Sequence, residues 1–195
     1  MTPVIENVYP EIDCGRFPVK RVVGDTLDVW ADIFGEGHGV LASKLRWRRA
    51  GASDWHESDM AHFDNDRWRG AFPLREVGRY VYTVQAYHDA FESWRQDLIK
   101  RKDAGEELAA ELLEGQRLAA DATGRASAPD EEKLRELLRR LQTSPSDTAR
   151  LELLLVDATA ALIRRHADRG SATKYRHELE VVVDREKARF SAWYE

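Results

Sequence analysis

The chain has 195 residues, of which 43% are hydrophobic and 33% charged, a composition typical of a folded globular protein and not of a disordered chain. Its formal net charge is −5, and Lys and Arg are interspersed with Asp and Glu, which argues against a nucleic-acid partner. No apolar run approaches the ~20 residues that a membrane-spanning helix needs, so we expect no membrane partner.

The single cysteine, Cys14, excludes an intrachain disulfide and suits a reducing compartment. Residues 1–6 lack the charged and apolar regions of a secretory signal. We therefore expect a cytoplasmic protein. No His or acidic residue accompanies Cys14 in a recognisable nucleophile motif, so we expect an unreactive thiol there.

Residues 4–91 follow the period of two that is typical of β-strands. In residues 26–34 the alternate positions are apolar, and further strands are predicted at residues 41–49, 67–72 and 80–87. Turn residues rich in Gly, Asp and Asn separate these strands at intervals of roughly ten residues. The pattern predicts a β-sandwich, and the order of the last two strands indicates an immunoglobulin-like module.

Residues 92–169 change to a helical period. A first helix is expected at residues 93–122, where Gly105 and Gly115 each lower helix stability by ~1 kcal/mol relative to Ala and leave a break or bend open. A second helix follows Pro129, and a third runs from about Ser144 to Gly170. Three antiparallel helices predict a small bundle, with one leucine stripe as a candidate contact for a second subunit.

After Thr173 the strand pattern returns, at residues 178–184 and again at the aromatic-rich end, residues 188–195. This order predicts a discontinuous sandwich of residues 1–91 and 173–195, with a helical bundle inserted at residues 92–172. The aromatic end has no polar tail, which indicates a boundary inside a longer protein.

Four tryptophans lie in the β region: Trp30, Trp47, Trp55 and Trp68. The favoured interpretation is core or interface packing, because Trp is highly buried on average. The alternative is an exposed platform on which sugar rings stack. Trp30 falls opposite the apolar positions of its strand, so it faces outward or is covered by another domain.

The strongest metal candidate is a cluster of His and Asp residues, namely His56, Asp59, His62, Asp64 and Asp66. It lacks a third His or Cys at zinc spacing, and it lacks the Glu and Gly of a calcium loop. Residues 64–66 are better explained as a turn, and the glycine-rich residues 35–39 match no phosphate or dinucleotide motif. We therefore predict no metal, cofactor or catalytic site in this chain.

Two segments carry a resemblance to a known family. The first is Val8-Tyr9-Pro10-Glu11-Ile12-Asp13-Cys14-Gly15-Arg16-Phe17-Pro18-Val19-Lys20, followed by residues 22–25. The second is residues 181–195, which end in Trp193-Tyr194-Glu195. Together they resemble the N-terminal region of the bacterial alpha-1,4-glucan:maltose-1-phosphate maltosyltransferases of the alpha-amylase superfamily. The likeness spans nearly the whole chain, although the helical part matches in pattern more than in residues.

The resemblance implies a β-sandwich with an inserted helical bundle, which precedes a (β/α)8 barrel and contributes to a homodimer. The family's catalytic and substrate-binding residues lie in the barrel, beyond Glu195, so none is carried over onto this chain. The motif residues are implied to have only a structural or interdomain role, and they are Asp13, Cys14, Gly15, Arg16, Trp193, Tyr194 and Glu195.

From this resemblance we expect an inactive fragment of a retaining maltosyltransferase of glycogen or α-glucan synthesis. The parent enzyme would transfer maltose from maltose 1-phosphate to the non-reducing end of α-1,4-glucans. This part would serve in dimerisation and in support of the barrel, through which glucan and maltose 1-phosphate would bind. The alternative is a glycan-binding β-sandwich that works on its own.

Overall fold

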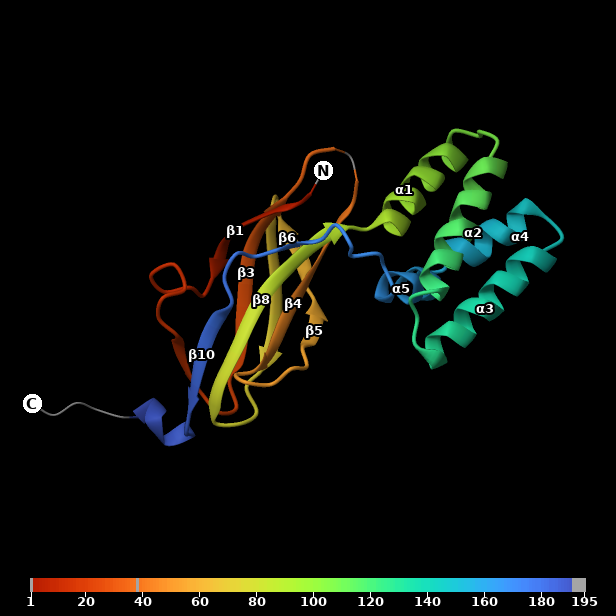
Figure 1. Cartoon of the computed structure of the whole chain (residues 1–195). Coiled ribbons are helices and arrows are strands. Elements are labelled where there is room, and N and C mark those ends of the chain that lie inside the picture. The colour runs from red at the N-terminus through yellow and green to blue at the C-terminus, as the bar shows by residue number, and fades with distance from the viewer. Residues whose placement is uncertain (1, 38, 191–195) are drawn as a thin grey trace, which may run out of the picture. The chain divides into compact units, whose positions relative to one another are not determined.

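A computed structural model describes residues 2–37 and 39–190 and shows two compact units, each with its own core (Figure 1). The sheet unit contains residues 2–36, 41–87 and 171–190. The helical unit contains residues 88–170, together with the described part of residues 37–40. The protein is therefore of mixed β and α structure, as the sequence predicted.

The sheet unit has two sheets (Figure 1). The first is antiparallel, and its strands in spatial order are β1 (Val4–Tyr9), β3 (Thr26–Phe34), β7 (Arg67–Pro73) and β6 (Ala61–Asp64). The second runs in the order β2 (Val19–Val22), β10 (Leu179–Asp184), β8 (Gly78–His88), β4 (Leu41–Arg49) and β5 (His56–Asp59), and β9 (Thr173–Lys174) also pairs with β8.

Strand β10 lies between two strands that are far from it in sequence. It pairs in parallel with β2, where Val181 is opposite Val19, and antiparallel with β8, where Val181 is opposite Tyr80. The first and last parts of the chain are thus joined within one sheet.

Side chains of both sheets meet in one hydrophobic core. The inward positions of β3 are fully buried as the alternation predicted, and they are Leu27, Val29, Ala31 and Ile33. Gly70 on β7 lets the side chains of Met60 and Leu45 pack closely against its backbone. A β-carbon there would lie 2.9 Å from Met60 Cγ and 3.1 Å from Leu45 Cβ. The alternating apolar positions therefore fix which face of each strand is buried.

Every strand predicted within residues 26–87 is present, with ends shifted by no more than two residues, and so is the strand at 179–184. The strand predicted from residue 188 onward is wrong at its start, because Glu186–Phe190 forms a short 3-10 helix, η1. The remainder of that segment lies outside the described residues.

The helical unit has five helices where the sequence predicted three: α1 (Ala90–Asp103), α2 (Ala109–Thr123), α3 (Ala128–Thr143), α4 (Asp147–Leu155) and α5 (Asp157–Arg165). The first predicted helix breaks at Gly105, whose φ of +72° gives a left-handed end to α1.

Within the described residues, none of the helices is long and apolar enough to span a membrane.

The second unexpected break lies between α4 and α5, at Val156, which is extended with φ −62° and ψ 129°. Arg95 of α1 donates hydrogen bonds from Nη2 to the Leu155 carbonyl oxygen at 2.9 Å and to Asp157 Oδ1 at 2.6 Å. The last carbonyl of α4 and the first acidic residue of α5 are thus bound by the same guanidinium, which stabilises the break.

Candidate functional site

The motif residues Asp13, Cys14, Gly15 and Arg16 form one tight turn in the sheet unit. Asp13, Cys14 and Gly15 all have left-handed backbone, with φ of +49°, +53° and +79°. The turn closes by a hydrogen bond from Arg16 N to the Asp13 carbonyl oxygen at 3.0 Å. Left-handed conformations at two residues other than glycine cost free energy, so surrounding contacts must hold the turn.

Two tyrosines hold the segment that leads into this turn. The buried Tyr82 hydroxyl donates to the Pro10 carbonyl oxygen at 2.5 Å, and the Tyr175 hydroxyl donates to Glu11 Oε2 at 2.6 Å. Burial raises the pKa of Tyr82 well above its usual value. Burial, with the hydrogen bond to Glu11, raises the pKa of Tyr175 to about 12. Both phenols therefore stay protonated as donors at neutral pH.

Gly15 is fixed in place by its neighbours as well as by its φ. A β-carbon there would lie 3.0 Å from Leu179 Cδ2 and 3.5 Å from His177 Cβ. The turn thus packs against the start of β10. The side chains of Ile12, Cys14 and Phe17 remain exposed to solvent. The structure brings the four motif residues together, whereas Trp193, Tyr194 and Glu195 lie outside the described residues.

A second feature, which we call the aromatic face, is a shallow depression of about 440 Å³ lined by Tyr9, Trp30, Phe63, Asp64 and Arg67. Tyr9 of β1 lies opposite Trp30 of β3 in the strand register. The Trp30 and Phe63 rings meet edge to face, with centroids 5.2 Å apart at 88°. Tyr9 is 57% exposed and Phe63 67% exposed, so this face presents aromatic rings to solvent.

The two arginines around the aromatic face are each paired with an aspartate. Arg67 Nη1 lies 2.7 Å from Asp32 Oδ1, and Arg69 Nη2 lies 2.7 Å from Asp28 Oδ1. Both guanidiniums also lie over the Trp30 ring, 5.7 and 5.3 Å from its centroid. Burial raises the pKa of Asp32, but hydrogen bonds from Arg67 and Asn7 outweigh it, and the net shift is downward.

Among the described residues of the sheet unit, the three tryptophans Trp47, Trp55 and Trp68 do not line this face. Trp68 is buried in the core, and Trp47 stacks on Phe72 with centroids 5.0 Å apart. The Trp55 ring lies beneath the guanidiniums of Arg46 and Arg48. The core interpretation therefore holds for Trp47 and Trp68, whereas Trp30 points outward, as its position on the strand predicted.

The residues considered as a metal cluster lie on or beside two short strands that follow each other in the chain but belong to different sheets. His56 and Asp59 are on β5, while His62 and Asp64 are on β6. Asn65 has a φ of +44° and forms the turn between β6 and β7, and its carbonyl oxygen is hydrogen-bonded to His62 Nε2. Within residues 2–37 and 39–190, no group of three or more His, Cys, Asp or Glu could hold a metal ion.

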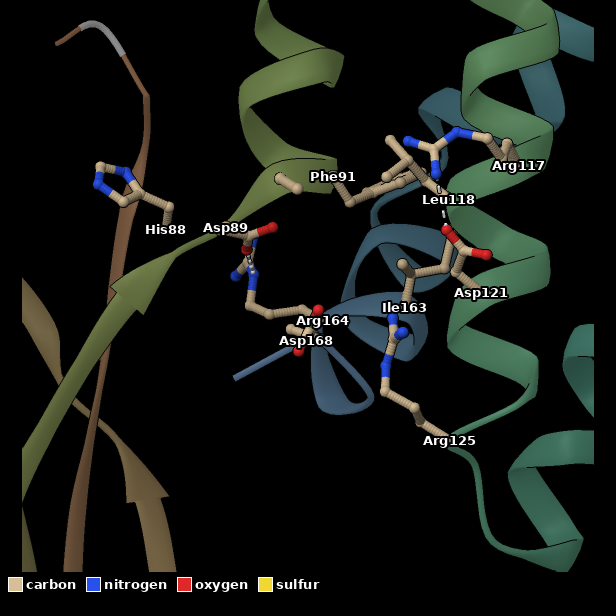
Figure 2. A pocket seen from close by; sticks show the side chains of 12 residues that line it. His88, Asp89, Phe91, Arg117, Leu118, Asp121, Arg125, Ile163, Arg164 and Asp168 are labelled. Atoms are coloured by element: carbon tan, nitrogen blue, oxygen red, sulfur yellow. Dashed lines mark hydrogen bonds and ion pairs between the residues drawn. The ribbon is translucent and has the colours of Figure 1, made fainter. Parts of the chain in front are cut away.

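A more enclosed pocket, of about 200 Å³, lies in the helical unit, and Figure 2 shows its lining. Its charged groups are joined to each other or to backbone. Arg164 Nε lies 2.9 Å from Asp89 Oδ2, and Arg117 Nη1 lies 3.0 Å from Asp121 Oδ2 (Figure 2). Arg125 Nε donates to a backbone carbonyl oxygen at 2.7 Å. The Asp89–Arg164 pair joins the start of α1 to α5, whereas Arg117 and Asp121 pair within α2.

The Asp89 carboxylate in this pocket has a clear structural role. It is 2% exposed, and its Oδ1 accepts a hydrogen bond from Glu92 N at 2.9 Å, which caps the start of α1. Its Oδ2 binds Arg164 of α5. One buried carboxylate therefore both caps α1 and fixes α5 against it.

A similar cluster joins α3 to the end of α5. The Asp130 carboxylate lies 3.1 Å from His166 Nε2, 3.0 Å from Arg165 Nη1 and 3.0 Å from Lys133 Nζ. The hydrogen bond from His166, followed by that from Lys133, holds the pKa of Asp130 below its usual value. The carboxylate is thus kept ionised at neutral pH.

Comparison with known proteins gives a consistent result. Residues 3–185 match the family described as alpha-1,4-glucan:maltose-1-phosphate maltosyltransferase, domain N/S. Three relatives that carry this enzyme name come from Myxococcus xanthus, Chlorobaculum tepidum and Burkholderia pseudomallei. They are 47%, 40% and 40% identical to this chain, respectively. The match covers 98% of this chain in each case, but only 30%, 28% and 17% of the respective relatives.

Proposed function

The chain belongs to the domain N/S family of alpha-1,4-glucan:maltose-1-phosphate maltosyltransferases, and from this membership we propose that it is the non-catalytic N-terminal part of such an enzyme. The observation that carries the proposal is the match of residues 3–185 to one domain of relatives that are at least three times longer. The parent protein would work in the cytoplasm, in glycogen or α-glucan synthesis.

The reaction proposed for the parent enzyme is transfer of maltose from maltose 1-phosphate to the non-reducing end of an α-1,4-glucan. A retaining transfer of this kind uses two carboxylates ~5–5.5 Å apart, one as nucleophile and one as acid and base. We place that pair in a barrel that follows this part of the chain. The motif turn would then serve in support of that barrel.

The sheet unit is proposed to be an immunoglobulin-like sandwich. Its first sheet has the order β1-β3-β7-β6, and its second contains β10-β8-β4. When β2, β5 and β9 are left out, the remaining strands can be lettered A to G in chain order. The two sheets then have the orders A-B-E-D and G-F-C, which are those of immunoglobulin domains. The helical unit would then be an insertion between the last two strands of that fold, β8 and β10.

The motif turn, Asp13 to Arg16, is proposed to contact the catalytic part of the enzyme. Its support comes from rigidity combined with exposure: Tyr82 and Tyr175 anchor the segment, while Ile12 and Phe17 stay exposed. For the proposed homodimer, the helical unit offers Leu113 of α2, which is 67% exposed. Leu113 is therefore the side chain with which the proposed dimer contact is tested.

The proposal is tested by incubating the purified chain with maltose 1-phosphate and a maltooligosaccharide acceptor. We expect no release of phosphate by this chain alone, and release under the same conditions by a full-length relative. Phosphate release by the purified chain would overturn the non-catalytic assignment. Sedimentation of the chain with and without Leu113→Glu tests the dimer contact, since loss of a dimer is expected only if α2 takes part.

A second candidate function is a glycan-binding module, favoured by the exposure of Tyr9 and Phe63 on one sheet. Exposed aromatic rings flanked by polar groups are suited to sugars, which have both apolar C–H faces and hydroxyls. Titration with maltooligosaccharides, followed by Trp fluorescence, tests this function. No change in fluorescence and no heat of binding would leave a scaffolding role alone.

A further inference from the structure

We propose that the aromatic face binds a short stretch of an α-1,4-linked glucose chain, with Tyr9 and Phe63 as the stacking rings. This inference rests on the second candidate function above and assigns it to named residues. The face consists of Tyr9, Trp30, Phe63, Asp64 and Arg67, and its volume of about 440 Å³ lies in the range of small-molecule sites.

The rings of Tyr9 and Phe63 are exposed enough to stack on a sugar, whereas the ring of Trp30 is not. Trp30 is half-buried, and the guanidiniums of Arg67 and Arg69 lie over its ring. Its edge-to-face contact with Phe63 orients the Phe63 ring, which remains 67% exposed. Trp30 therefore acts as a support, and the open faces of Phe63 and Tyr9 are left for a sugar ring.

Polar groups for sugar hydroxyls lie beside these rings. Asp64 lines the depression, and nothing in the described part of the chain forms a hydrogen bond or ion pair with its carboxylate. Arg67 uses Nη1 for Asp32, and a guanidinium has five N–H donors in all. The face thus offers an acceptor and further donors to the hydroxyl groups of a bound sugar.

The charges of the aromatic face argue against an anionic ligand. Arg67 and Arg69 are each paired with an aspartate at 2.7 Å, so the face has no surplus of positive charge for a phosphate or a nucleic acid. A neutral polysaccharide needs no positive charge in its binding site. The relatives are named for an α-1,4-glucan, and an acceptor of that chemistry is the neutral polymer that the parent enzyme would meet.

The test measures binding of maltoheptaose and of glycogen to the full 195-residue chain, by calorimetry and by co-sedimentation. The variants are Phe63→Ala and Tyr9→Ala, with Phe17→Ala as a matched control, because Phe17 is also about half exposed but lies outside the aromatic face. We expect each of the first two variants to raise Kd about tenfold, the value of one lost aromatic stacking contact. Phe17→Ala should leave Kd unchanged.

The outcomes separate this inference from the function on which it rests. If the unaltered chain binds maltoheptaose and all three variants bind equally well, glycan binding stands and the aromatic face is overturned as its site. If the unaltered chain binds neither glucan, the glycan-binding function fails together with its site. If Phe63→Ala instead dissociates a dimer in sedimentation, the face is a subunit contact and the proposal is wrong. Circular dichroism checks that every variant is folded.

Discussion

The indole ring of Trp94 lies directly against the α-carbon of Gly115. A β-carbon built on Gly115 would fall 2.5 Å from Trp94 Cη2, and the indole Nε1 is fixed by a hydrogen bond to the Glu111 carbonyl oxygen at 2.9 Å. Gly115 is thus kept inside α2 for packing, although a glycine weakens a helix.

Gly115→Ala is therefore expected to destabilise the protein, by about 1–3 kcal/mol, because overpacking against a fixed ring outweighs the better helix propensity of Ala. Unfolding in urea, followed by circular dichroism, measures the change. Gly124→Ala is the matched control, since a β-carbon there meets only Asp121 O at 3.6 Å. Equal stability of the Gly115 variant and the original chain would contradict the packing role.

Tyr82→Phe removes the buried hydroxyl that donates to the Pro10 carbonyl oxygen. We expect a loss of stability of about 0.5–1.5 kcal/mol, with more if the carbonyl oxygen finds no other partner. Tyr80→Phe is the control, because the Tyr80 hydroxyl makes a longer bond, 3.3 Å, to Glu76 O in a less buried place. A larger effect in the control than in Tyr82→Phe would refute the anchoring of this segment.

Stability should also fall at alkaline pH. The pKa of Tyr175 is raised from its usual 10.0 to about 12, so between these values the folded state binds more protons than the unfolded state. The contribution of Tyr175 is complete below pH 10 and is lost as the pH rises toward 12. Urea midpoints at pH 8 and pH 11 measure this, and Tyr175→Phe should show a smaller fall than the original chain.

Asp130→Asn should destabilise the helical unit at pH 7, since it removes the charge that His166, Arg165 and Lys133 surround. The lowered pKa means that the contribution of the carboxylate is present above pH 3.8 and is lost as the pH falls through the native value. The variant and the original chain should therefore converge in acid. Glu131→Gln, which breaks an exposed pair with Arg135, is the control and should have little effect.

The sequence predicted the strands whose alternate residues are apolar and missed those without that pattern. Thr26–Phe34 shows the alternation clearly, and all its inward residues are buried. All four residues of β5 are polar, and all four residues of β6 are exposed, so no alternation of buried and exposed residues marks these short strands. Their pairing with β4 and β7 is a property of the fold and not of their own residues.

The helix breaks show the same limit. Gly105 could be suspected from sequence, because only glycine adopts a left-handed φ readily. Val156 could not, because the groups around it are bound by Arg95, some sixty residues away in the chain. Local propensity predicted a continuous helix at Val156, whereas hydrogen bonds from the distant Arg95 side chain stabilise a break there.

For the candidate sites, the motif turn was found through family resemblance, and the outward position of Trp30 through alternation. Tyr9 and Phe63 were missed, because they approach Trp30 only when β1, β3, β7 and β6 lie in that spatial order. Asp64 had been considered for a metal and for a turn, and the structure adds its place beside the exposed rings.

The position of β10 between β2 and β8 has a consequence for synthesis on the ribosome. Both neighbours are made well before β10, and the whole helical unit must be translated in between. At roughly 5–20 residues per second, this delay is on the order of ten seconds. During that time β2 and β8 have open edges, so the nascent chain is most exposed to aggregation and to chaperones before residue 184 emerges.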